Sequence, residues 1–312
     1  MLAVESTSSL RPRRDFAADI AANKNKSAIL LILLGAILVL LGAGFGAYIG
    51  SVELGVIGGL LIALIVGLVA YFDGARTILD LSGARKADPQ RDQVVINVVD
   101  EMRIAGGLPM PEVYVIETDA LNAFATGRDP QHAVVAVTTG LVNKLNREEL
   151  QGVVGHEMSH IRTFDIRYMM LVAALVGAIV LLSDGMLRGG RFFGGRRSRG
   201  GGSGNAIFLI LALVLAIIAP LFAALLQMAI SRKREFMADA GGVELTRNPL
   251  ALASALEKID HHLIADPLPG ANRGTQHLYI ANPLHRFKWN ASALMSTHPP
   301  MEERIARLRA MG

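Results

Sequence analysis

Two histidines four positions apart, with a glutamate beside the first, are the residues of this sequence best suited to chemistry. They are His156, Glu157 and His160 in the stretch GHEMSH. Side chains four positions apart project from the same face of an α-helix, so both imidazoles can reach one metal ion. Zinc accepts such nitrogens as ligands, and a neighbouring carboxylate can take a proton from a water molecule. The spacing therefore predicts a hydrolytic zinc site with Glu157 as general base.

The residues around this motif favour a helix. Asn146 and Glu149 have the spacing of a capping box, which marks a helix start. Apolar residues then recur with the helical period, at Leu150, Val153, Val154 and Met158. We expect a helix from Asn146 through His160, with this apolar stripe buried.

The composition limits the other ligands and indicates a membrane protein. The chain contains no cysteine, which excludes a thiolate zinc site, a cysteine nucleophile and a disulfide scaffold. Any metal must therefore be held by histidines and carboxylates. Hydrophobic residues make up 52% of the 312 residues and are concentrated in blocks. Such blocks are typical of membrane proteins, and the net charge of +4 fits membrane topology better than nucleic-acid binding.

The motif leaves the third protein ligand to be found. One class of zinc proteases supplies it locally, through a glycine and a further histidine shortly after the motif. Here Thr163 and Ile166 stand at those two places, so that route is closed. Asp165 is one remaining local candidate, although it could instead cap the approach to an apolar block.

A more distant stretch, SRKREFMADAGG (231–242), offers a better candidate. Glu235 and Asp239 lie one helical turn apart in it. Glu235 would complete a His-His-Glu site with one position open for water, and Asp239 would orient a histidine ligand. The alternative is that both acids only pair with the arginines of the same stretch.

Four apolar blocks divide the chain, at 28–50, 54–72, 168–186 and 206–230. The first two carry no charge over a length that can cross a bilayer. Basic residues precede the first block and follow the second, so the positive-inside rule places the N-terminus and the chain after residue 73 in the cytoplasm.

The connection between the third and fourth blocks, the Gly/Arg-rich loop 188–204, conflicts with that rule if both blocks span. The pair could be re-entrant, or the loop could lie on lipid headgroups, and we favour two spans. A flexible linker explains its composition without RNA binding.

The remaining segments indicate a globular part. We expect a helix within 73–107, strands at 112–118 and 132–139, and a helix starting at Asn248-Pro249. We expect four parts: a polar tail (1–27), a transmembrane hairpin (28–72), a cytoplasmic zinc protease domain (73–167 and 231–312) and a second apolar hairpin (168–230).

Four motifs placed around these blocks resemble the HtpX family: HEMSH, SRKREFMADAGG, LNAFATG (121–127) and STHPPMEERI (296–305). Its members are membrane-bound zinc endopeptidases of protein quality control, related to the CAAX prenyl endopeptidases. The likeness runs from near Ile20 to the end of the chain. The long polar tail and the Gly/Arg-rich loop are less typical of the family. The resemblance implies an integral membrane protein, mainly α-helical, with a zincin-like domain that contains a small β-sheet.

The resemblance also implies one zinc ion per subunit, bound by His156, His160 and Glu235. Glu157 would be the general base, and Asp239 would orient a ligand. The implied substrates are misfolded or damaged membrane proteins, cleaved at the cytoplasmic face of the cell inner membrane. The partners would thus be unfolded protein and the lipid bilayer, with no nucleic acid.

Two further motifs receive roles from the resemblance. LNAFATG would form an edge strand, on which a substrate peptide pairs near Asn122 and Ala123; alternatively, Asn122 is only a turn residue. His298 and Arg304 would approach the metal to stabilise the oxyanion or supply a proton. His298 could instead fill the open zinc position and keep the enzyme latent, or merely precede a helix, with Arg304 in a surface salt bridge.

Two other function classes compete with this interpretation. In an intramembrane protease of the site-2 type the zinc motif lies within a membrane span. Charged residues at Arg147, Glu148 and Arg162 argue against that placement. A membrane chaperone or transporter with a structural zinc is disfavoured, because structural sites are usually closed by four protein ligands.

Overall fold

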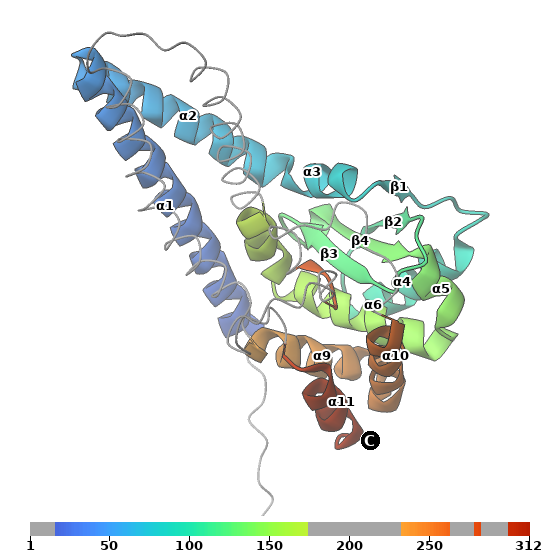
Figure 1. The fold of residues 1–312 in the computed structure, drawn as a ribbon. Coiled ribbons are helices and arrows are strands. Elements are labelled where there is room, and N and C mark those ends of the chain that lie inside the picture. Colours follow the sequence, from blue (N-terminus) through green and yellow to red (C-terminus); the bar gives the residue numbers. More distant parts are fainter. Residues whose placement is uncertain (1–15, 174–231, 263–277, 282–298) are drawn as a thin grey trace, which may run out of the picture.

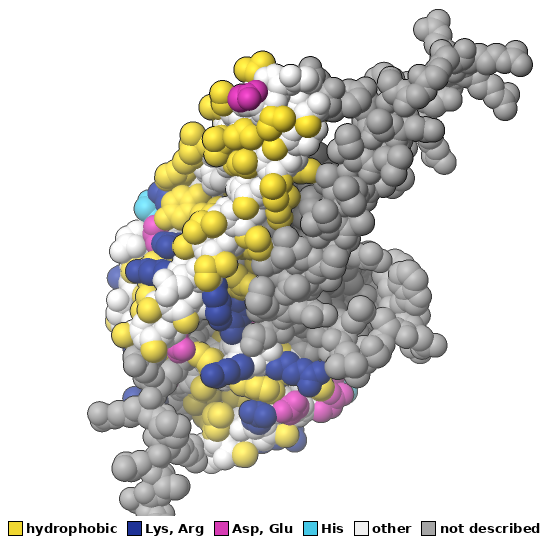
Figure 2. Space-filling view, turned by 90° about the vertical axis from the view of Figure 1, so that its left-hand side faces the viewer, with side chains coloured by type: hydrophobic (Ala, Val, Ile, Leu, Met, Phe, Trp, Pro, Cys, Tyr) yellow, Lys and Arg dark blue, Asp and Glu magenta, His cyan; other side chains and the backbone are white. Residues whose placement is uncertain are grey.

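The computed structural model describes residues 16–173, 232–262, 278–281 and 299–312, in which two long helices extend from a smaller α/β body (Figure 1). The long helices are α1 (Phe16–Ile49) and α2 (Val52–Phe72). Both are long and apolar enough to cross a bilayer, with only 6% and 11% of their most apolar windows buried. Figure 2 shows their hydrophobic side chains gathered on the outer surface, with lysines and arginines below them. Exposed apolar side chains of this kind are suited to contact with lipid.

The two helices pack closely because glycines face one another. A Cβ atom added at Gly55 would lie 2.1 Å from the carbonyl oxygen of Gly42. Small residues at such positions let the backbones of membrane helices approach. Residues 28–72 thus form a helical hairpin, and its crossing of the membrane stays a prediction. Of the third and fourth blocks only 168–173 lies within the described residues, where it is helical and buried.

Helix α1 begins at Phe16, so residues 16–27, expected as part of a polar tail, belong to the helix. This polar start contacts the globular part. The Nδ2 atom of Asn23 donates to the carbonyl oxygen of Thr163 at 3.0 Å, and Lys24 lies over the Phe164 ring. Together with other helices, α1 lines a partly open pocket of about 180 Å³ that reaches His160.

The sheet has four strands in the order β1-β2-β4-β3, with only β2 and β4 parallel. The strands are β1 (Ala84–Lys86), β2 (Glu112–Ile116), β3 (Ala123–Gly127) and β4 (Ala133–Thr138). The expected strands at 112–118 and 132–139 are confirmed as β2 and β4, which are parallel neighbours, and β3 pairs antiparallel with β4. Strand β3, which contains the NAFATG motif except for its first residue Asn122, lies at an edge of this sheet.

The helix expected within 73–107 is present, and the same region also holds a second helix and a strand. Helix α3 (Gly74–Leu81) continues from α2, β1 follows, and α4 (Gln93–Gly106) ends at Gly107, whose φ of 61° suits glycine. A short 3₁₀ turn, η1 (Pro130–His132), precedes β4, and α5 (Thr139–Lys144) follows it.

The central helix is α6 (Arg147–Arg162), which packs against β3 and three other helices: α4, α9 (Arg232–Thr246) and α10 (Pro249–His262). Its capping box at Asn146 and Glu149 forms as expected. Glu149 also accepts a hydrogen bond from Lys258 at 2.7 Å, which ties α6 to α10. The expected apolar stripe of α6 is buried. The last helix, α11 (Met301–Arg309), packs on α9 and α10.

Candidate metal centre

Helices α6 and α9 approach closely enough to place their acidic and imidazole side chains together. A Cβ atom on Gly242 would lie 2.9 Å from the backbone nitrogen of His156. Only glycine fits there without a shift, so Gly242 permits this approach. The result is that Glu235 and Asp239, one turn apart on α9, both face His156.

The side chains of His156, His160 and Glu235 form a buried cluster that could hold a metal ion. The Nε2 atoms of the two histidines lie 3.2 Å apart. They lie 3.7 and 3.9 Å from the nearer Glu235 oxygens. Ligands of a tetrahedral zinc ion at about 2.1 Å would be separated by about 3.4 Å. The three donor groups therefore fit a zinc ion in both type and spacing.

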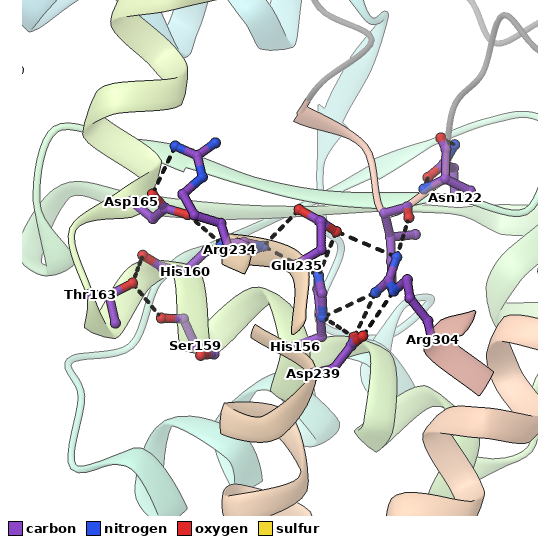
Figure 3. A network of polar contacts seen from close by, with 12 residues as sticks. Asn122, His156, Ser159, His160, Thr163, Asp165, Arg234, Glu235, Asp239 and Arg304 are labelled. Atoms are coloured by element: carbon purple, nitrogen blue, oxygen red, sulfur yellow. Dashed lines mark hydrogen bonds and ion pairs between the residues drawn. The ribbon is translucent and has the colours of Figure 1, made fainter. Parts of the chain in front are cut away.

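A carboxylate holds the outer nitrogen of each histidine (Figure 3). The Nδ1 atom of His156 lies 2.8 Å from Asp239, and that of His160 lies 2.9 Å from Asp165. These contacts favour the tautomer whose Nε2 lone pair points into the cluster. Asp165, the local candidate for the third ligand, thus contacts the far side of His160.

Each of these carboxylates is paired with an arginine. Arg234 Nη1 lies 3.1 Å from Asp165, and Arg304 Nη2 donates to Asp239 at 2.6 Å. Burial raises the pKa of each carboxyl group, but the neighbouring arginine and the hydrogen-bonded histidine outweigh it, so both pKa values are lowered. Both carboxylates therefore stay ionised at neutral pH.

Replacing Asp165 with Asn should weaken zinc binding by about 10–100-fold, the usual effect of losing a partner behind a metal-bound histidine. Asparagine keeps the shape but loses the charge facing His160 and Arg234. Zinc affinity can be measured by competition with a chromogenic chelator, with Asp100→Asn on the surface of α4 as control. A dissociation constant equal to that of the wild type would contradict this role of Asp165.

Glu157 lies in the same buried pocket but is held differently. Within the described residues neither of its carboxylate oxygens has a hydrogen-bond partner of good geometry. Burial raises the pKa of Glu157, which the nearby His156 and His160 offset only in part. A carboxylate with a raised pKa and unsatisfied oxygens is suited to accepting a proton.

Arg304 is fully buried, so the alternative of a surface salt bridge is wrong. Its Nε and Nη2 atoms both donate to Asp239, and its Nη1 lies 3.4 Å from Glu235. Burial lowers the pKa of Arg304, but the charge of Asp239 raises it by more, so the net effect is a raised pKa. The guanidinium therefore stays charged. Arg304 thus contacts both α9 carboxylates, those of Glu235 and Asp239.

Ala123 is the first residue of β3 and Asn122 directly precedes it, and both contact residues 278–281 of the same chain. His298 lies outside the described residues. The sequence interpretation did not single out Arg234 or the segment Leu278–Ala281. The only signal for the latter was a run of four apolar residues in a polar region.

Comparisons with known proteins identify a family of proteases. A model of peptidase family M48 matches residues 89–312. The protease HtpX homolog of Dictyoglomus thermophilum is 43% identical over 293 residues, covering 94% of each chain. That of Caldanaerobacter subterraneus subsp. tengcongensis is 42% identical, covering 93% of this chain and 96% of the relative. The crystal structure of Ste24p from S. mikatae superposes with a TM-score of 0.50 at 19% identity, covering 94% of this chain and 67% of that one.

The structural likeness to Ste24p concerns the fold alone, whereas the sequence matches extend over nearly the whole chain. The chain belongs to peptidase family M48, a family of metalloproteases, and within it resembles the proteases named HtpX homologs.

Proposed function

We propose that this protein is a membrane-anchored zinc endopeptidase that hydrolyses peptide bonds of misfolded or damaged membrane proteins as part of protein quality control. The observation that carries the proposal is the buried His156, His160 and Glu235 cluster with Glu157 beside it. One zinc ion per subunit would be held by the three cluster residues, where it would supply a Lewis acid for the scissile carbonyl and the attacking water.

The remaining steps depend on the chain's own groups. Glu157 would take the proton of the attacking water and pass it to the departing amine. Asp239 and Asp165 would keep His156 and His160 in the tautomer that offers Nε2 to the metal. Arg304 would hold Asp239 in place. His298 stays a prediction, either as a group that supports catalysis or as a ligand in the latent enzyme.

The proposed location is the cell inner membrane, as a multi-pass protein with its site facing the cytoplasm. Both ends of the α1–α2 hairpin meet the protease body on one side (Figure 1). Lys24 and Lys26 lie at that end of α1, and Arg76 follows α2. The positive-inside rule makes this side cytoplasmic.

The reaction can be tested on the full chain purified in detergent. Removing metal with a chelator should abolish cleavage of an unfolded protein, and one equivalent of Zn²⁺, but not Mg²⁺, should restore it. Bound zinc is quantified by elemental analysis alongside the rate. Cleavage that continues at full rate in protein stripped of its metal would contradict the proposal.

A further inference from the structure

Residues Leu278–Ala281 lie against the edge strand β3 beside the metal cluster. All four are at most 3% exposed. The backbone N–H of Ile280 donates to the carbonyl oxygen of Ala123 at 3.0 Å. This is the contact by which an added peptide pairs with a sheet edge. The segment therefore uses a backbone group of the strand on which a substrate is expected to bind.

The side chain of Asn122 binds the next residue of the segment. Its Nδ2 atom donates to the carbonyl oxygen of Ala281 at 3.0 Å, and its Oδ1 faces the Ala281 N–H at 3.4 Å. Thr138 of β4 holds the backbone of Asn122 through three hydrogen bonds. The amide is thus fixed in an orientation that recognises a peptide backbone.

Arg304 completes the set of contacts. Its Nη1 atom donates to the carbonyl oxygen of Ile280 at 3.0 Å, from the same guanidinium that contacts Glu235 and Asp239. The N–H and C=O groups of Ile280 and Ala281 are therefore all bound by residues around the metal cluster. None of these contacts depends on the side chains of the segment.

We infer that Leu278–Ala281 occupies the place of a substrate peptide and that a substrate must displace it to reach Glu157. The inference rests on the proposed function. A second set of contacts holds the segment: the ring of Tyr279 packs edge-on against Phe124 at 5.2 Å, and its hydroxyl lies 3.3 Å from Ser82 Oγ. The segment is thus a competitor built into the chain.

The inference can be tested by weakening the segment. Ile280→Pro removes the N–H that binds Ala123, and Ile280→Val keeps it as the matched control. Losing one hydrogen bond should favour displacement, so the KM for an unfolded substrate should fall about two- to ten-fold with kcat unchanged. A folded, zinc-loaded Ile280→Pro enzyme with lower kcat and unchanged or higher KM would overturn the inference, because the segment would then be a permanent part of the site.

Hydrogen exchange supplies a test that does not depend on turnover. In zinc-loaded Glu157→Gln protein, saturation with an unfolded peptide should speed exchange at the amides of Ile280 and Ala281. Peptide binding that leaves both amides protected would overturn the inference. A different result would count against the proposed function alone: the peptide displaces the segment, but the zinc-loaded wild type does not cleave that peptide.

Discussion

The Glu157→Gln enzyme is expected to cleave an unfolded substrate with a kcat about 10²–10⁴-fold below that of the wild type, while binding zinc normally. Glutamine fills the same space but cannot accept the proton of the attacking water. Glu157 does not belong to the His156, His160 and Glu235 cluster, so the metal site should stay intact. The measurement is steady-state cleavage with zinc content determined on the same sample.

Stability provides an independent readout of the same substitution. Burial raises the pKa of Glu157, so its ionised form costs the folded protein stability as pH rises through that pKa. Glutamine carries no such cost, and the metal-free variant should melt at the same or a higher temperature than the wild type at neutral pH. Glu148→Gln, an exposed change on the same helix, is the control. Wild-type kcat at full zinc occupancy would rule out Glu157 as general base.

Glu235→Gln is expected to weaken zinc binding by more than the roughly 10–100-fold that follows loss of an outer partner, because a ligand itself is altered. Glutamine keeps the size of the side chain but removes the charge that faces both histidines. Cleavage should be lost at limiting zinc. Competition with a chromogenic chelator gives the affinity, and the visible absorption of the Co²⁺-loaded protein reports the ligand set.

The matched control is Glu244→Gln on the same helix α9, where the side chain is 43% exposed and pairs with Arg162. It should leave the zinc dissociation constant unchanged. If Glu235→Gln binds zinc as tightly as this control, another group must be the third ligand.

The parts of the site that could be predicted from sequence are those defined by local patterns. The helix from Asn146 through His160 follows from a capping box and an apolar period, both of which act within a few turns. Glu235 is different, because no local rule brings α9 to α6. Its candidacy came from ligand chemistry and family likeness, and the contact itself depends on the close approach at Gly242.

Other features carry too weak a local signal. Leu278–Ala281 is too short for a period of 2 or 3.6 residues to be recognised. The polar start of α1 resembled a tail because its residues are mostly polar, and nothing local shows that Asn23 and Ser27, on either side of the exposed Lys24 and Lys26, are buried. The parallel pairing of β2 with β4 leaves no local signal, because it depends on the long-range order of the sheet.

Cutting the chain at residue 73 to obtain a soluble fragment would remove more than an anchor. Asn23 would no longer satisfy the carbonyl of Thr163, at the end of the helix that carries both histidines. The partly open pocket of about 180 Å³ beside His160 and Asp165 would lose the side that α1 provides. Water would then reach the buried carboxylate that holds the second histidine. A truncated enzyme would therefore have to keep residues 16–27, for example joined to the body by a designed linker.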